Sequence, residues 1–140
     1  METRYITHSP NETEEIGREL AKTLHGGQVV ALYGDMGMGK TVFVRGMASI
    51  LSPKAEAQSP TFALAHVYPG KPNFVHFDMY RITSWEDLYS TDYFEYIDAG
   101  DIVATEWSEN IEAAIPEGSI RVRITKLSDS SRQIDLEGVS

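Results

Sequence analysis

The sequence predicts an α/β fold with a mostly parallel sheet that closes with a C-terminal antiparallel hairpin. Short apolar, β-rich runs alternate with helical patterns between residues 9 and 105, which is typical of strands joined by crossover helices. A glycine-rich loop links the first of these runs to the next helix. Near the C-terminus, two alternating segments flank a polar turn. In such a sheet, ligands bind at the carboxyl ends of the strands.

A helix is expected to begin at residue 10, because the sequence there carries a full N-terminal signal. Ser9 is the expected N-cap, Pro10 takes the first helical position, and Glu12 completes a capping box. Gly26 and Gly27 are expected to end this helix. Its apolar face consists of Ile16, Leu20 and Leu24.

The remaining elements follow from apolar runs and their punctuation. Residues 28–33 are suited to a buried strand, and an apolar helix over residues 42–51 is stopped by Ser52-Pro53. Further strands are expected over residues 62–68, 73–77 and 102–105, a helix from Ser84 with apolar residues continuing towards Gly100, and hairpin strands over 120–124 and 133–136 around a turn at 128–131. No repeat or linker interrupts the pattern, so we expect a single domain over residues 1–140.

The loop between the first strand and its helix carries the strongest chemical signal. Residues 34–41 fit G-x-x-x-x-G-K-[ST], the phosphate-binding loop of nucleotide hydrolases and kinases. Gly34 and Gly39 allow the backbone N–H groups to converge on a diphosphate. Lys40 reaches the outer phosphates, and the hydroxyl of Thr41 binds Mg²⁺. A glycine-rich turn that merely contains a lysine is the weaker alternative.

Two acids follow predicted strands at the end where such a site needs them. Asp78 and Glu106 each come directly after an apolar strand. Either can bind Mg²⁺ directly, act through a water molecule, or polarise the attacking water, and spacing does not separate these roles. Trp107 follows at once; its ring can stack on a base or pack as a half-buried aromatic.

Two further residues have a functional and a plainer interpretation. Thr61 follows Ser59-Pro60 at the place where nucleotide switches carry a threonine that senses the γ-phosphate, although the spacing alone slightly favours a tight turn. Arg81 lies just after Asp78 and can act as an arginine finger, but pairing with a carboxylate is favoured.

Composition restricts the functional classes. The chain has 140 residues, a net charge of −9 and no cysteine. With no long apolar run and no secretion signal, a cytoplasmic protein without a membrane span is expected. Twelve basic against 21 acidic residues make a poor general footprint for nucleic acid. Contact with RNA is therefore expected only indirectly, through a protein partner, or at a small basic patch.

Four blocks of sequence together resemble the TsaE (YjeE) family, the bacterial ATPase of tRNA threonylcarbamoyladenosine (t6A) synthesis. They are residues 34–46, Ser59-Pro60-Thr61-Phe62, His76-Phe77-Asp78-Met79-Tyr80-Arg81 and Glu106-Trp107-Ser108-Glu109. The loop alone is generic, whereas the other three blocks together are specific. Met36, Met38 and Val42 depart from the common pattern of the family, and Ser108 stands where proline is common.

The resemblance implies a three-layer P-loop NTPase fold, Mg²⁺-dependent ATP hydrolysis in the cytoplasm, and partnership with the TsaB–TsaD complex. It assigns the hydrolytic role to Asp78 and magnesium to Thr41 and Glu106. Together with the loop motif and the switch position described above, the expected catalytic residues are Lys40, Thr61 and Asp78. The implied nucleotide-binding residues are Thr13, Gly34, Asp35, Met36, Gly37, Met38, Gly39, Lys40, Thr41, Val42 and Trp107.

Other functions on the same loop stay open. A small-molecule kinase is one, although the chain shows no arginine-rich lid, and a binding module gated by ATP without required hydrolysis is another. A GTPase is disfavoured, because no N-K-x-D guanine motif occurs in the sequence.

Overall fold

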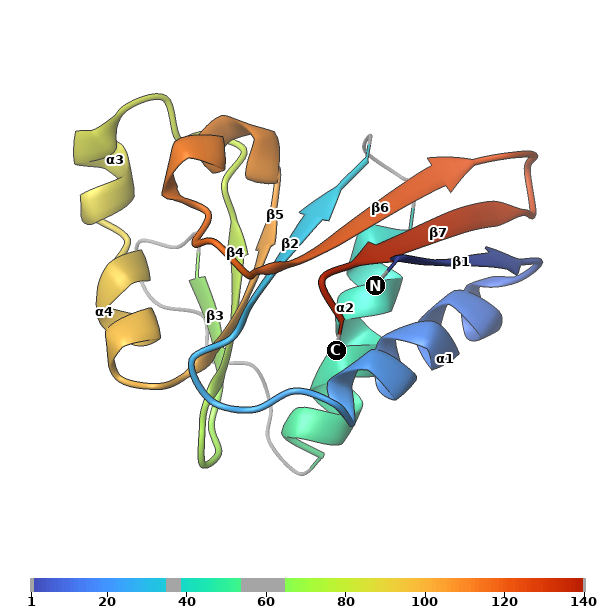
Figure 1. Cartoon of the computed structure of the whole chain (residues 1–140), viewed down its shortest axis with the longest axis horizontal. Coiled ribbons are helices and arrows are strands. Elements are labelled where there is room, and N and C mark those ends of the chain that lie inside the picture. Colours follow the sequence, from blue (N-terminus) through green and yellow to red (C-terminus); the bar gives the residue numbers. More distant parts are fainter. Residues whose placement is uncertain (1, 35–38, 54–64, 140) are drawn as a thin grey trace.

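The computed structural model describes residues 2–34, 39–53 and 65–139. Within them, seven strands form one sheet in the order β1-β7-β6-β2-β5-β4-β3 (Figure 1). Its centre is parallel and consists of β6 (Ile120–Lys126), β2 (Val29–Tyr33), β5 (Ile102–Glu106) and β4 (Phe74–Asp78). The outer strands β1 (Glu2–Thr7), β7 (Arg132–Glu137) and β3 (Ala65–Tyr68) pair antiparallel with their neighbours. The predicted parallel sheet with its C-terminal hairpin is therefore confirmed.

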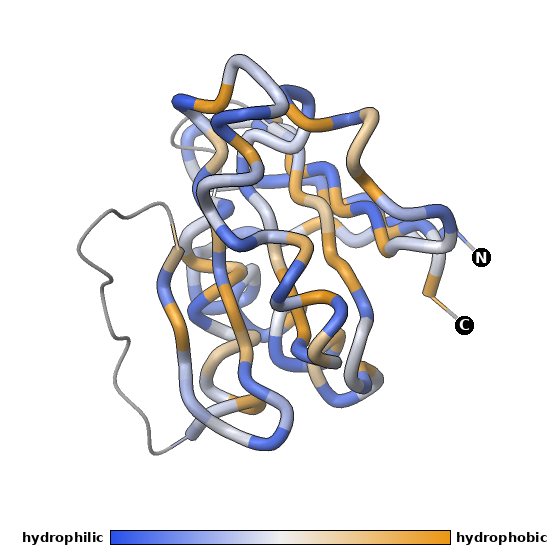
Figure 2. The backbone as a smooth tube through the Cα atoms, turned by 90° about the vertical axis from the view of Figure 1, so that its left-hand side faces the viewer, coloured by the Kyte–Doolittle hydropathy of each residue, from blue (hydrophilic) through white to orange (hydrophobic). Residues whose placement is uncertain are grey.

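Helices cover both faces of this sheet, which gives three layers (Figure 1). α1 (Pro10–Ala21) and α2 (Lys40–Leu51) pack on one face, against inward side chains such as Val30 and Leu32. On the other face, α3 (Trp85–Tyr89), α4 (Tyr93–Asp98) and the 3-10 helix η1 (Ser108–Ala114) pack against residues such as Val75 and Phe77. The hydrophobic stretches along the central strands are visible in Figure 2. None of the helices in the described ranges is long and apolar enough to cross a membrane.

The start of α1 follows its sequence signal closely. The Ser9 hydroxyl accepts a hydrogen bond from the Glu12 amide at 3.2 Å. In a capping box, the Glu12 carboxylate would accept a hydrogen bond from the amide of the N-cap, Ser9. Here it accepts instead from the amide of His8, one residue earlier, at 2.8 Å. The helix ends at Ala21, earlier than the predicted stop at Gly26, and a turn fills the gap.

Two elements were not expected from the sequence. β1 forms an edge strand along β7, and η1 follows β5 directly. The region after Ser84, predicted as one helical start with apolar bulk, contains the two short helices α3 and α4. Of the strand predicted over residues 62–68, the part from Ala65 to Tyr68 forms β3 and the rest lies outside the described residues.

Two glycines allow α1 and α2 to pack backbone against backbone. A Cβ atom at Gly46 of α2 would lie 2.1 Å from the carbonyl oxygen of Glu14 in α1. A Cβ atom at Gly17 of α1 would lie 2.2 Å from the carbonyl oxygen of Phe43 in α2. No side chain fits at either position without moving a helix. This crossing fixes α1 beside the helix that follows the phosphate-binding loop.

Gly46→Ala should therefore lower the free energy of unfolding by about 2–3 kcal/mol, because the added methyl group meets backbone rather than a flexible side chain. Urea unfolding followed by circular dichroism measures this. Ser49→Ala, at an exposed position of the same helix, serves as the control and should change stability by less than about 0.5 kcal/mol. An unchanged midpoint for Gly46→Ala would contradict the close crossing.

Candidate functional site

The candidate site lies where three parallel strands end at the same edge of the sheet. Gly34, the first residue of the phosphate-binding loop, follows β2. Asp78 is the last residue of β4 and Glu106 the last residue of β5, and the two acids are register partners across these neighbouring strands. The structure thus brings the loop and both predicted acids to one edge, as the strand assignments required.

The described part of the loop has the backbone that the motif needs. Gly34 and Gly39 have φ angles of 138° and 105°, in a region that side chains disfavour. Gly39 is the N-cap of α2, and its carbonyl accepts the first helical hydrogen bond from Phe43 at 3.0 Å. The predicted nucleotide-binding residues Asp35, Met36, Gly37 and Met38 lie outside the described residues.

Lys40 connects the loop to the end of β5. Its side chain is only 4% exposed, and its Nζ donates to the carbonyl oxygen of Gly34 at 2.6 Å. The same ammonium lies 4.7 Å from the ring centroid of Trp107, within cation–π range. In the first turn of α2, Thr41 is exposed and Val42 is half-buried. The predicted phosphate, metal and aromatic residues therefore meet around one lysine.

Glu106 is a mostly buried carboxylate with a histidine partner. Its Oε2 lies 2.7 Å from Nε2 of His76, and their side chains are 12% and 11% exposed. Burial raises the pKa of Glu106, but the hydrogen bond from His76 and the electrostatic influence of His76, Lys40 and His66 together bring it below its ordinary value. Glu106 is consequently a carboxylate at neutral pH, the form that binds a cation.

Asp78 is held much more lightly. One of its carboxylate oxygens accepts a hydrogen bond from the amide of Tyr80 at 3.0 Å, and the residue is half-buried. The neighbouring Arg81 is exposed and forms no ion pair with any residue in the described ranges, so the carboxylate pairing favoured for it is not seen there. Asp78 therefore keeps free acceptor capacity at the strand end.

Trp107 adopts a backbone conformation that is rare for a bulky residue, with φ 58° and ψ 41°. Its ring packs edge to face on Tyr80, with centroids 5.1 Å apart. The turn is pinned by Ser108, whose fully buried hydroxyl lies 2.6 Å from the Thr105 hydroxyl and donates to the Thr105 carbonyl at 2.9 Å. Base stacking by Trp107 stays a prediction.

Thr13 lies next to the loop, although it belongs to α1. Its Cγ2 is 3.6 Å from the point where a Cβ atom at Gly39 would stand, so the two residues are in contact range. Thr13 is buried, and its hydroxyl lies 2.8 Å from the hydroxyl of Thr7. The glycine crossing of α1 and α2 is what brings it there. Contact of Thr13 with a nucleotide remains a prediction.

The sequence analysis assigned no role to His76, although the structure pairs it with Glu106. The spacing shows only that His76 and Asp78 point to the same face of the sheet, since His76 precedes Asp78 by two residues on β4. The pairing with Glu106 follows from the register of β4 with β5. The predicted sensor Thr61 lies outside the described residues. All other predicted site residues of the described ranges gather at the loop or at the adjoining strand ends.

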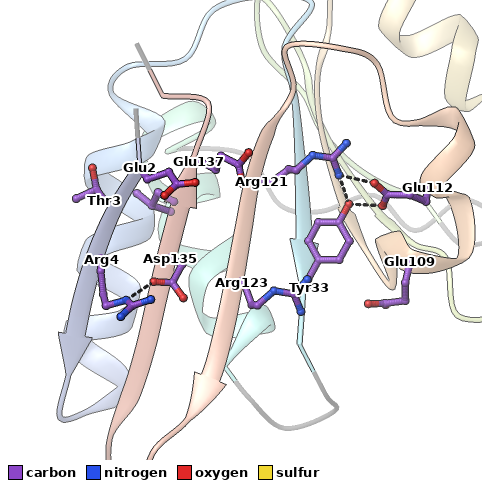
Figure 3. Close-up of a pocket in the computed structure, with 11 residues that line it drawn as sticks. Glu2, Thr3, Arg4, Tyr33, Glu109, Glu112, Arg121, Arg123, Asp135 and Glu137 are labelled. Carbon is purple, nitrogen blue, oxygen red and sulfur yellow. Dashed lines mark hydrogen bonds and ion pairs between the residues drawn. The ribbon is translucent and has the colours of Figure 1, made fainter.

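Apart from the candidate site, a hollow lies beside η1, where charged side chains of the sheet face the helix (Figure 3). It encloses about 1130 Å³ and is lined largely by charged side chains of β1, β6, β7 and η1. Tyr33 donates to Glu112 at 2.6 Å, Arg121 donates to both residues, and burial together with the Glu112 hydrogen bond raises the pKa of the Tyr33 phenol. These bonds tie η1 to β2 and β6. We assign this cluster a structural role, since it holds the helix that follows Trp107.

Comparison with known proteins gives a consistent result. The profile of the family described as "Threonylcarbamoyl adenosine biosynthesis protein TsaE" matches residues 7–134. The chain is 34% identical over 131 residues to the tRNA threonylcarbamoyladenosine biosynthesis protein TsaE of Treponema pallidum, covering 94% of this chain and 97% of the relative. The same-named protein of Rickettsia prowazekii is 35% identical over 130 residues, covering 91% and 90%.

Among solved structures, the crystal structure of YdiB from Bacillus subtilis superposes with a TM-score of 0.79 at 27% identity. The superposition covers 100% of this chain and 87% of that one. The predicted P-loop NTPase fold is therefore confirmed.

His76→Phe removes the hydrogen bond to Glu106 but keeps an aromatic ring beside His66. At pH 7 we expect the free energy of unfolding to fall by about 1–3 kcal/mol, because a buried carboxylate loses its donor. Although burial raises the pKa of Glu106, His76 and its charged neighbours bring it below the ordinary value. The stability that these neighbours of Glu106 contribute is thus fully present above the pKa of Glu106 in the unfolded chain. It is lost as the pH falls through the pKa of Glu106 in the folded protein. The deficit of the variant should narrow as the pH is lowered from 7 towards 4.

Urea unfolding at several pH values measures this difference. In a Glu106→Gln background there is no carboxylate to protonate, so His76→Phe should cost less and its cost should hardly vary with pH. A cost that is the same in both backgrounds and at every pH would show that His76 acts only by packing.

Proposed function

This chain belongs to the TsaE family, whose members act in tRNA threonylcarbamoyladenosine biosynthesis, and we propose that it binds Mg²⁺–ATP and hydrolyses it in that process. The observation that carries the proposal is the position of Lys40. The lysine of a phosphate-binding motif lies against the loop backbone, beside the aromatic ring that follows β5 and within electrostatic reach of a buried glutamate. Such a lysine is placed to neutralise outer phosphates.

The donor set fits magnesium that arrives with a nucleotide. In the described part of the chain, no group of three or more His, Cys, Asp or Glu side chains could hold a metal alone. Magnesium in nucleotide sites is usually held by one or two carboxylates or hydroxyls together with substrate phosphates. Glu106 supplies a carboxylate that is charged at neutral pH, and Thr41 supplies an exposed hydroxyl. Bound magnesium would neutralise charge on the transferred phosphoryl group.

The two acids suit different tasks. Glu106 is fixed by His76 and is electrostatically poised for a cation before any chemistry occurs. Asp78 has one backbone donor and free acceptor capacity, which suits a residue that orients the attacking water or accepts its proton. We therefore assign metal binding to Glu106 and the hydrolytic step to Asp78.

We propose further that the ATPase works in the cytoplasm on the TsaB–TsaD complex and meets tRNA only through it. The chain has 140 residues, and the residues of its candidate site are suited to binding phosphates. Its net charge of −9 disfavours general binding to RNA. Hydrolysis in such a protein is best used to drive a partner through its cycle.

Lys40→Ala should weaken ATP binding by roughly ten- to a hundredfold or more, because one full charge against the phosphates is lost. Titration with a fluorescent ATP analogue measures the affinity. Lys22→Ala, an exposed lysine at the far end of α1, is the matched control and should bind as the wild type does. Unchanged affinity in Lys40→Ala would remove the phosphate-loop assignment.

Asp78→Asn should bind Mg²⁺–ATP nearly normally and lose most of its turnover, because the amide keeps the shape but cannot accept a proton. Glu106→Gln should instead reduce the magnesium dependence of ATP binding, because a metal ligand acts before chemistry begins. Affinities with and without Mg²⁺, followed by single-turnover hydrolysis, separate the two. The opposite pattern would swap the roles, and equal loss of both functions in both variants would indicate one shared metal shell.

A further inference from the structure

The negative charge of the protein is concentrated in one segment. Residues 82–120 contain ten of the 21 acidic residues, none of the 12 lysines and arginines, and none of the four histidines. This segment forms α3, α4, β5 and η1, all within the described part of the chain. The rest of the protein is nearly neutral, so the net charge of −9 belongs largely to one side of the fold (Figure 1).

Two large aromatic side chains stand exposed on this acidic side. Trp85 and Tyr89 are 52% and 60% exposed. They lie one turn apart on α3, and their ring centroids are 6.2 Å apart. The ring centroid of Tyr89 also lies 5.5 Å from that of Phe94 in α4. Aromatic rings of this size gain free energy when covered, and Trp and Tyr are enriched where proteins meet. The rings on α3 and α4 thus form a continuous aromatic strip.

A groove of about 180 Å³ adjoins the strip, between α3 and η1. Ile82, Leu88, Ile111 and Ala114 provide apolar lining, and Trp85 lines it as well. Its size suits one inserted side chain rather than a small-molecule substrate, which typically needs several hundred cubic ångströms.

The acids around the strip are not neutralised within the protein. Glu86, Asp92, Glu95 and Asp98 are exposed and form no ion pair with any residue of the described ranges. Asp87 differs, since its carboxylate accepts hydrogen bonds from the amide and hydroxyl of Thr83, the residue before the N-cap Ser84 of α3. Whatever covers the aromatic strip must therefore bring its own positive charge.

We propose that the aromatic strip, the adjoining groove and the acids beside them form the docking surface for a basic protein partner. That partner would insert an apolar side chain into the groove and place Lys or Arg side chains over Trp85 and Tyr89. Cation–π contact and the surrounding carboxylates both favour such cations. A nucleic acid would bring phosphates against these acids, and a second copy of this chain would face like charge with like charge. Charge complementarity thus selects a basic protein surface.

The docking surface connects directly to the hydrolytic end of the site. The chain runs from Asp78 through Met79 and Tyr80 to Ile82, which already lines the groove. Asn110, another lining residue, donates to the carbonyls of Met79 and Tyr80 at 3.0 and 3.3 Å. A partner in the groove would therefore press on the segment that positions Asp78. This inference rests on the proposed function, because it names the surface through which a partner reaches the ATPase site.

The test measures binding of the full chain to the TsaB–TsaD complex at low and high salt. Two double variants are compared with the wild type. The aromatic variant, Trp85→Ala with Tyr89→Ala, and the charge-reversal variant, Glu86→Lys with Glu95→Lys, should each bind at least tenfold more weakly. Tyr5→Ala, which removes an exposed aromatic of β1, and Glu19→Lys, which reverses an exposed acid of α1, are the matched controls and should bind normally. Wild-type binding should weaken with salt, and the charge-reversal variant should lose part of that dependence.

ATP affinity and thermal unfolding of every variant are measured in parallel. If both surface variants bind TsaB–TsaD as tightly as the wild type does, the docking surface is overturned and the ATPase proposal stays intact. A wild-type chain that binds ATP but not TsaB–TsaD would overturn the proposed partner, and the surface with it. The charge-reversal variant adds no cavity, so it keeps the test valid if the aromatic variant unfolds. Self-association or tRNA binding that depends on Trp85 and Tyr89 would also overturn the choice of a basic protein.

Discussion

The charged state of Glu106 is the constraint on which the candidate site depends. A buried carboxylate costs several kcal/mol unless donors and positive charges surround it. Here the compensation comes from His76 on β4, His66 on β3 and Lys40 at the start of α2. The strand order, the parallel register of β4 with β5 and the fold of the loop must all be in place for ionised Glu106 to be compensated where it is buried. The arrangement that stabilises this charge is therefore also the one that assembles the site.

The same constraint explains why Lys40 is buried, although lysine side chains are usually exposed. Its ammonium donates to the Gly34 carbonyl, lies over the Trp107 ring and acts on Glu106 through its charge. These are modest interactions compared with two phosphate groups. A lysine held in this way is pre-positioned but not locked, so it can turn to an anionic ligand without breaking a strong ion pair.

Much of the fold could be predicted from local signals. The capped start of α1, the apolar run of β2 and the alternation along β6 and β7 each specify their own element. Strands ending in Asp78 and Glu106 then predict an acidic edge, because parallel strands end together. In such segments, propensity, pattern and tertiary environment agree.

The missed elements lack such agreement. β1 turns only Thr7 into the core, while Tyr5 and Ile6 are exposed, so its sequence carries no core-facing pattern and its structure comes from backbone pairing with β7. η1 is a short, irregular helix held by contacts of Glu112 with Arg121 of β6 and with Tyr33, which is 79 residues away in the sequence. The bond from His76 to Glu106 depends on strand register, which single residues do not reveal.

The two acids differ in how firmly they are held, and this bears on how a partner could control hydrolysis. Glu106 is held by a 2.7 Å hydrogen bond to His76 and lies within the electrostatic influence of Lys40 and His66. Among the described residues, Asp78 has one hydrogen-bond donor, the Tyr80 amide, and that amide belongs to the segment that Asn110 ties to the groove beside α3. Displacement of this segment would change the direction in which the Asp78 carboxylate points. It would also reach the end of β5, because the Met79 amide donates to the Glu106 carbonyl at 3.0 Å and Tyr80 packs on Trp107. Under the proposed assignments, a partner in the groove would therefore act both on Asp78 and, through Tyr80, on the Trp107 ring that lies beside Lys40.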